Sequence, residues 1–251
     1  MDEQRLNKVI AHSGLCSRRK ADELILAGAV CVNGERVTEP GVRVDAEKDR
    51  VTVDGREILS MSAGSGVKGH SYVLLHKPAQ VVSTASDPQR RETVLDLLPP
   101  FYAGKRLYPV GRLDYFSEGL LLLTDDGELT NRMTHPRYHL PKEYEVRVRE
   151  HPTEDMLAAM RSGMKLAEGE QLAPVEVWLD VKEPGLMRLT LHQGINRQIR
   201  RMCRDLGLTI LRLKRVSIGP LHMSTLPKGK CRALDKEEVA ALYKAVGLRA
   251  D

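Results

Sequence analysis

Hydrophobic residues near the N-terminus recur at the spacing of two short helices. Leu6, Val9 and Ile10 fall on one face of a predicted first helix. Ser17 has a side chain typical of helix N-caps, and it precedes a second helical pattern that runs to about Leu26. The chain is therefore predicted to begin with a pair of helices.

The pattern then changes to short paired strands. An Asn-Gly turn at 33–34 separates two runs of strand character, and Asp-Gly at 54–55 repeats the arrangement. Residues 1–59 are thus predicted to form one small unit of helix, helix and sheet. Residues 60–71 are rich in glycine and serine, which predicts a flexible linker.

Beyond the linker, residues 72–245 carry both strand-like and helical patterns. Helical periodicity covers 153–162 and 196–206. Strands and helices do not follow each other as regular βαβ units, which predicts an α+β domain with a largely antiparallel mixed sheet flanked by helices. The strand-like runs lie at 72–76, 120–123, 144–148, 175–179 and 187–192.

The composition is that of a globular protein. Hydrophobic residues make up 41% of the 251 positions, and no apolar run nears the roughly 18 residues of a membrane span. The charged N-terminus has no apolar segment of the signal-peptide type. The four cysteines form no Cys-x-x-Cys pair, which favours reduced thiols over a zinc site. We therefore expect a cytoplasmic protein with no membrane association and no metal site.

Basic side chains are concentrated in one segment. The net charge is only +5, yet residues 195–232 hold ten basic side chains and one acidic one, so this segment carries +9 and the rest of the chain −4. A concentrated positive charge favours a polyanionic partner such as nucleic acid. A solvated cationic face has the same composition, so charge alone leaves both interpretations open.

Short motifs run through the N-terminal unit: Arg-Leu-Asn-Lys at 5–8, Gly-Leu-Cys-Ser-Arg-Arg-Lys-Ala at 14–21, Gly-Ala-Val at 28–30 and Val-Asn-Gly at 32–34. Together they resemble the S4 RNA-binding domain. The resemblance implies that the start of the second helix and the following strand grip structured RNA. A helix N-terminus attracts phosphate, and adjacent cations strengthen that attraction. The candidate RNA contacts here are Arg5, Lys8, Arg18, Arg19 and Lys20.

Residues 196–206 predict an amphipathic helix that ends at Gly207. One face is apolar, and the other carries arginines at i, i+3, i+4 and i+7. Like charges at these spacings repel one another, so an acidic partner is expected, either RNA or an active-site carboxylate. The arginines are Arg197, Arg200, Arg201 and Arg204.

An aspartate follows an arginine in the motif Gly-Arg-Leu-Asp at 111–114, just before an aliphatic run. Asp114 thus lies in a loop that a strand can hold rigidly. With residues 117–127, 142–146 and 194–202, this motif resembles, in the same order, the RsuA/RluB family of ribosomal RNA pseudouridine synthases. The match covers roughly residues 5 to 240.

The resemblance implies a role for each of three residues. Asp114 is the expected catalytic aspartate, Tyr144 the active-site tyrosine, and Arg200 the arginine that pairs with the aspartate. No cofactor is implied, and we expect a monomer. The remaining RNA contacts expected in this half of the chain are Arg112, Arg197, Arg201 and Arg204.

The motif at 196–202 looks more like the large-subunit, RluB-like members of the family than the small-subunit member. This favours 23S ribosomal RNA, or a ribosomal precursor particle, as the partner. Two alternatives remain open. One is a pseudouridine synthase that acts on 16S ribosomal RNA, and the other is a ribosome-assembly factor that binds RNA and whose catalysis is secondary.

Pseudouridine formation breaks the N1–C1′ glycosidic bond, turns the base and rejoins it through C5. A carboxylate can act as a covalent nucleophile or steer elimination at the ribose, and the sequence leaves both routes open. The target uridine has to leave the RNA stack to reach such a group. Tyr144 can stack on its uracil.

Other interpretations of these residues need no catalysis. Tyr144 also fits a half-buried sheet position, and Arg200 alone also fits a phosphate contact. Glu118 and Asp125-Asp126 suggest a paired-carboxylate hydrolase. We discount that idea because Asp-Asp-Gly is a natural turn and helix cap.

Overall fold

The computed structural model describes residues 3–46, 48–58, 69–138 and 140–249. The chain divides into two compact units, Met1–Gly69 and His70–Asp251. Most of the predicted linker falls on residues that lie outside those described. Its last residue, Ser71, donates its backbone N–H to Asp125 Oδ1 in the second unit at 2.9 Å. No helix in the described residues is long and apolar enough to cross a membrane.

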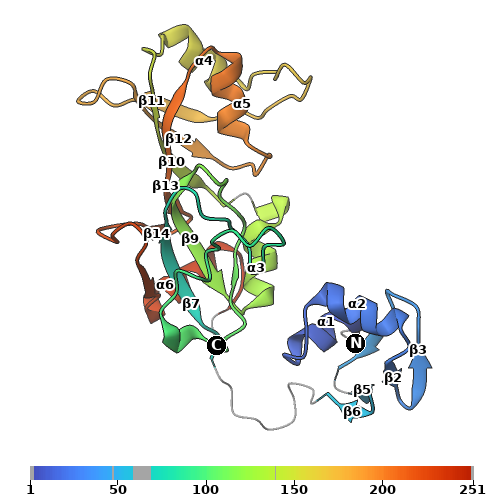
Figure 1. The fold of residues 1–251 in the computed structure, drawn as a ribbon. Coiled ribbons are helices and arrows are strands. Elements are labelled where there is room, and N and C mark those ends of the chain that lie inside the picture. The colour runs from blue at the N-terminus through green and yellow to red at the C-terminus, as the bar shows by residue number, and fades with distance from the viewer. Residues whose placement is uncertain (1–2, 47, 59–68, 139, 250–251) are drawn as a thin grey trace. The chain divides into compact units, whose positions relative to one another are not determined.

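The N-terminal unit packs helices α1 and α2 against short antiparallel strands around one apolar core (Figure 1). As predicted, Ser17 caps α2, because its Oγ accepts the backbone N–H of Lys20 at 3.2 Å. Both predicted turns, 33–34 and 54–55, join antiparallel strands. The elements are α1 (Leu6–His12), α2 (Arg18–Leu26), β1 (Glu3–Arg5), β2 (Val30–Val32), β3 (Glu35–Val37), β4 (Arg43–Asp45), β5 (Val51–Val53) and β6 (Arg56–Glu57).

Within its described residues, the second unit forms one mixed sheet of nine strands. The main order is β11-β12-β10-β13-β9-β7-β15, with β14 beside β13 and β8 beside β9. All pairs are antiparallel except β9 with β13, so the predicted α+β class and largely antiparallel sheet are confirmed. The strands are β7 (Tyr72–Lys77), β8 (Tyr108–Pro109), β9 (Glu118–Thr124), β10 (Lys142–Val148), β11 (Glu176–Leu179), β12 (Leu186–Leu191), β13 (Ile210–Ile218), β14 (Leu221–His222) and β15 (Cys231–Ala233).

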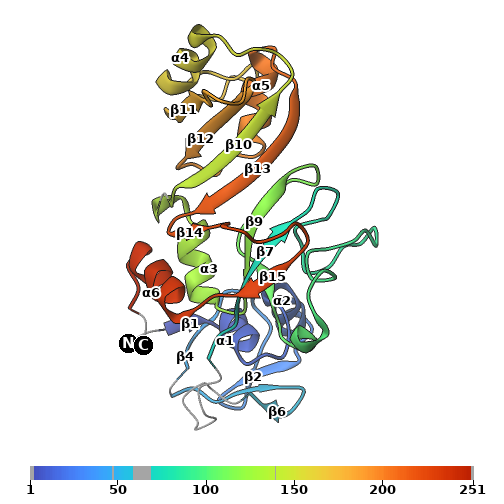
Figure 2. The ribbon, with the colours of Figure 1, turned by 90° about the vertical axis from the view of Figure 1, so that its left-hand side faces the viewer.

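Helices cover this sheet at two places. Figure 2 shows the long strands β10 and β13 running from the part that carries α4 and α5 to the part that carries α3 and α6. Each part has its own apolar cluster. The helices are α3 (Gly127–Thr134), α4 (Glu154–Ser162), α5 (Gln198–Asp205) and α6 (Lys236–Ala245), with 3₁₀ turns at η1 (Pro100–Tyr102) and η2 (Pro136–Tyr138).

The helix predicted at 196–206 begins two residues late. Arg197 has a left-handed backbone, with φ of +51°, and stands as the N-cap residue of α5. Gly207 follows the helix with φ of +71°, as its predicted terminator. The correction matters because Arg197 leaves the helical arginine face that the spacing predicted.

Strand β13 occupies the middle of the sheet, yet the hydrophobic pattern gave no strand there. Arg212, Lys214 and Arg215 interrupt the apolar alternation, which made the segment look like a solvated basic stretch. β13 pairs with β10 on one side and with β9 on the other. It therefore joins the two parts of the sheet, and it carries residues of the site described next.

Candidate active site

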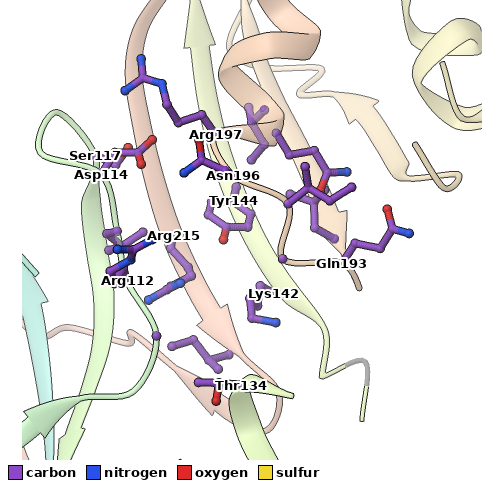
Figure 3. Close-up of a pocket in the computed structure, with 18 of the residues that line it drawn as sticks. Arg112, Asp114, Ser117, Thr134, Lys142, Tyr144, Gln193, Asn196, Arg197 and Arg215 are labelled. Carbon is purple, nitrogen blue, oxygen red and sulfur yellow. The ribbon is translucent and has the colours of Figure 1, made fainter. Parts of the chain in front are cut away.

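A pocket of about 540 Å³ opens where the loop before β9 faces β10 and β13 (Figure 3). Asp114, Tyr144 and Arg200, the three residues predicted to act together, all line it. They come from a loop, a strand and a helix that lie far apart in the sequence. Other lining residues include Arg112, Ser117, Lys142, Asn196, Arg197, Gln198, Leu213 and Arg215.

Asp114 and Arg200 form an ion pair at the pocket wall. Arg200 Nε lies 3.2 Å from Asp114 Oδ2, and its Nη2 donates to Ser117 Oγ at 2.9 Å. The two side chains are 29% and 18% exposed, so the pair is partly shielded from water. Because Arg200 holds only Oδ2, the second carboxylate oxygen stays outside this ion pair. The predicted pairing of these two residues is thus present.

A buried lysine supports the turn that carries Asp114. The Ser117 N–H donates to Asp114 O at 3.0 Å and closes the turn. Lys77 is fully buried, and its Nζ donates to Pro78 O and Ser117 O at 2.8 Å and to Asp114 O at 3.3 Å. Burial lowers the pKa of Lys77 to about 8, although the nearby Asp114 carboxylate opposes this. A cation thus lies beneath the loop.

Ser83 fixes the residue before Asp114. Its Oγ donates to Leu113 O at 2.8 Å and accepts the Leu113 N–H at 3.1 Å. Both partners are buried, so water does not compete for these bonds. Side chains on two other segments therefore hold the backbone on both sides of Asp114, as a preorganised site requires.

The sheet supplies the opposite wall. Tyr144 on β10 and Arg215 on β13 are direct partners in the register, and both line the pocket. Arg215 is 3% exposed and donates from Nε to Leu120 O at 2.8 Å. Lys142 precedes Tyr144 by two residues and donates to Leu140 O at 2.9 Å. Burial, and then the charge of Arg215, lower the pKa of Lys142 to about 8.

The predicted RNA contacts of this unit divide into two groups. Arg112 and Arg197 line the pocket. Arg201 and Arg204 instead form ion pairs with carboxylates of the protein, so these carboxylates offset the expected repulsion along α5. The pairs are Arg201 with Glu168 and Glu170, and Arg204 with Glu168 and Asp205.

The predicted contacts of the N-terminal unit lie on its surface, with Lys8 partly buried. Arg18 reaches Asn7 Oδ1 at 3.5 Å, and Lys20 pairs with Glu23 at 2.9 Å. Arg18, Arg19 and Lys20 form the first turn of α2, where the sequence placed them. The remaining residues of this group, Arg5 and Arg19, are exposed.

The carboxylates that suggested a hydrolase have structural partners instead. Buried Glu118 forms ion pairs with Arg212 and Lys228. Asp126 caps α3 through the N–H groups of the first turn, and it also accepts a hydrogen bond from Tyr72 at 2.9 Å. No group of three or more metal-ligating side chains gathers within the part of the chain that the structure describes.

Sequence reasoning did not predict several lining or supporting residues of the site, among them Lys77, Ser83, Ser117, Lys142, Gln198 and Arg215. For Lys77 the sequence does contain a signal, because a lysine followed by a proline ends an apolar strand there. Gln198 is 5% exposed, and neither atom of its amide group has a partner among the described residues. The position of Gln198 on a helical wheel does not predict that its amide is buried without a partner.

Comparisons with known proteins agree along the whole chain. The family model described as RNA pseudouridylate synthase matches residues 71–205, and that of the S4 domain matches residues 4–51. The chain is 41% identical over 243 residues to the ribosomal large subunit pseudouridine synthase B of Bacillus subtilis, covering 95% of both. It is 40% identical over 253 residues to an RNA pseudouridine synthase of Aquifex aeolicus, covering 99% of this chain and 97% of the relative. A crystal structure of a pseudouridylate synthase matches with a TM-score of 0.67 at 30% identity, covering 95% of this chain and 99% of that one.

Proposed function

Because the chain belongs to the RNA pseudouridylate synthase family and carries an S4 domain, we propose that it isomerises a specific uridine of large-subunit (23S) ribosomal RNA to pseudouridine. The observation that carries this proposal is the Asp114–Arg200 ion pair in a pocket that Tyr144 also lines. The relative named for the large ribosomal subunit and the motif at 196–202 support the choice of RNA.

Asp114 is the group that acts on the ribose. Its turn is held by Lys77 and Ser117, and Arg200 orients one carboxylate oxygen. The free oxygen can attack C1′ or accept a ribose proton, and both routes break the N1–C1′ bond. Preorganisation of this kind is the main contribution that a rigid loop makes to rate.

Tyr144 holds the base while it turns. It lies on the sheet wall of the pocket, where its ring can stack on an everted uracil. The pocket volume of about 540 Å³ lies in the range of small-molecule sites and suits one nucleotide. Exposed Arg112 and Arg197 are placed to contact the phosphates on either side of it.

We propose that one chain suffices for the reaction, because Asp114, Tyr144 and Arg200 all come from the same molecule. The RNA, either free or in a ribosomal precursor particle, is the partner. Arg5, Lys8, Arg18, Arg19 and Lys20 of the S4 domain bind it outside the pocket, chiefly through phosphates.

The test is Asp114→Asn, which keeps the shape of the side chain and removes its charge. We expect the variant to bind a protein-free 23S transcript within about threefold of the wild type. It should form no pseudouridine, as detected by carbodiimide modification and primer extension. Asp125→Asn is the matched control, because Asp125 lies outside the pocket and contacts His70 and Ser71.

An active Asp114→Asn enzyme would reject the assignment of this carboxylate. Mapping the pseudouridines of 23S and 16S RNA from a deletion strain tests the target separately. A missing pseudouridine in 16S RNA would contradict the large-subunit proposal and leave the chemistry intact.

A further inference from the structure

The pocket holds a buried guanidinium that the reaction scheme above does not use. Arg215 is 3% exposed, and its Nε donates to Leu120 O. Its Nη2 has no hydrogen-bond partner among the described residues. A buried donor without a partner destabilises the protein, and more so when it is charged. Such a donor in a pocket wall suggests a partner that arrives with the ligand.

A second cation lies beside it. Lys142 is two residues from Tyr144 on β10 and so shares its face of the strand, and Arg215 is the cross-strand partner of Tyr144 on β13. The register between β10 and β13 shifts between Glu143 and Tyr144, and both cations nevertheless line the pocket. In Figure 3 the side chains of Arg215 and Lys142 lie on the same side of Tyr144, away from Asp114. Neither cation forms an ion pair within the described part of the chain.

The chemistry of the proposed function creates an anion at this place. When the N1–C1′ bond breaks, its electron pair leaves with the base, and the positive end at C1′ is taken by the Asp114 carboxylate or relieved by loss of a ribose proton. The free uracil is then an anion with charge on its ring nitrogens and carbonyl oxygens. When C5 bonds to C1′, the bond between C1′ and Asp114 breaks or, on the elimination route, the ribose takes back its proton. The C5 proton then leaves to solvent and N1 takes up a proton, so the reaction is an isomerisation.

We propose that Arg215 and Lys142 form a cationic subsite that binds the detached uracil as an anion. This inference rests on the proposed function and adds catalytic residues to it. A base stacked on Tyr144 would lie beside both cations, because all three residues line one pocket and the two cations neighbour Tyr144 on the sheet. Fixed positive charge at the point where negative charge develops lowers the barrier without reorganisation.

A backbone phosphate is the competing occupant, and burial argues against it. RNA phosphates run along the surface of a protein, where exposed Arg112 and Arg197 already line the pocket. Arg215 instead lies in the pocket wall, where it is 3% exposed. Only the part of the nucleotide that enters the pocket, which is the base, comes near it.

The experiment compares Arg215→Gln and Lys142→Gln with the wild type in single-turnover reactions. The target uridine is first located by primer extension on 23S transcript. A synthetic RNA of that segment then carries uridine or 5-fluorouridine at this one position. We expect each variant to lose about 10²–10³-fold in rate on uridine. RNA affinity should stay within about threefold of the wild type, because the anion exists only after bond cleavage.

Fluorine withdraws electrons and stabilises the base anion without help from the protein. The rate deficit of both variants, measured as loss of the 5-fluorouridine nucleoside from digested RNA, should therefore be smaller on the fluorinated substrate. Arg147→Gln is the matched control. Arg147 lies on the same strand but three residues from Tyr144, so it points to the other face, where it pairs with Glu183.

Three results would overturn the subsite. One is full activity of both variants while Asp114→Asn is inactive, which leaves the proposed function standing. Another is a loss of rate in the variants that is equal on the uridine and 5-fluorouridine substrates. The third is weakened binding with a salt slope reduced by about one, the signature of a phosphate contact. If Arg215→Gln fails to fold, as judged by thermal unfolding, the less buried Lys142→Gln decides the question alone.

Discussion

The active site depends on a glycine at the point where β9 meets β13, and replacing it gives the sharpest test of the architecture. Gly119 pairs with Arg215 in the parallel part of the sheet and has φ of +116°. A Cβ built on Gly119 would lie 2.5 Å from the Arg215 backbone N and closer still to its carbonyl oxygen. Real Cβ atoms essentially never come within 3.0 Å of a heavy atom outside their own residue and its chain neighbours, so Gly119→Ala has to push the strands apart.

Two costs add in this variant. A left-handed backbone costs a residue with a Cβ about 1–2 kcal/mol. Overpacking against an immobile backbone adds about 1–3 kcal/mol. We therefore expect Gly119→Ala to lower the free energy of unfolding by about 2–5 kcal/mol. Gly169→Ala is the matched control, because Gly169 has φ of +93° and nothing within 4 Å of its built Cβ. Gly169→Ala should lose only the backbone cost of about 1–2 kcal/mol in free energy of unfolding.

Urea unfolding of the wild type and both variants measures the difference. Activity gives a second readout, because the shift separates the Asp114 loop from the residues of β10 and β13. Misplacing reacting groups by about 1 Å costs on the order of 100-fold in rate, so folded Gly119→Ala should be slower by about tenfold or more. Equal destabilisation of the two variants, or a folded Gly119→Ala enzyme at full rate, would refute the reasoning.

Two further predictions concern charge. Burial raises the pKa of Asp126, but hydrogen bonds from Tyr243, a backbone N–H and Tyr72 outweigh it and lower the pKa overall. Asp126 therefore stabilises the fold above about pH 4 and loses this effect as pH falls through its folded-state pKa. Urea unfolding from pH 7 to pH 2.5 measures the effect. The difference in free energy of unfolding between wild type and Asp126→Asn should become smaller below pH 4, and a difference that stays constant would contradict this. For RNA binding, the slope of log affinity against log salt concentration should become smaller in magnitude by about one in Arg197→Gln. It should change less in Arg201→Gln, because two glutamates already neutralise Arg201. Equal slopes would contradict that.

Features with a local cause were predictable from the sequence. The cap at Ser17, the turn at 33–34 and the helix at 153–162 depend on neighbouring residues, and all three are present. The pairing of Asp114 with Arg200 has no local cause, because 86 positions separate them, and it was expected from the resemblance to the family. The fold class also followed from the order of strands and helices.

Features set by distant packing were not predictable. β13 was not predicted as a strand because charged residues interrupt its apolar pattern, and their partners lie on distant segments of the chain. The glutamates that neutralise Arg201 lie on a loop about 30 residues earlier. Buried Lys77 and Arg215 look like ordinary surface cations until the chain folds over them. A helical or strand period shows which side of an element is apolar, but it does not show which polar side chain a distant segment will bury.

The layout of charge in the pocket fits a bond that breaks heterolytically. The Asp114 carboxylate lies on the loop side of the pocket, and the Arg215 and Lys142 cations lie on the sheet side. In the proposed reaction, positive charge develops at C1′ on the first side and the base becomes negative on the second. Asp114 lies in the loop that leads into β9 and Arg215 lies on β13, so the parallel pairing of β9 with β13 sets the register between the two sides. A one-residue slip there would move the carboxylate by about 3.3 Å along the sheet and turn the facing residues away. In the proposed reaction, the short junction at Gly119 therefore sets the position of the carboxylate relative to the cations.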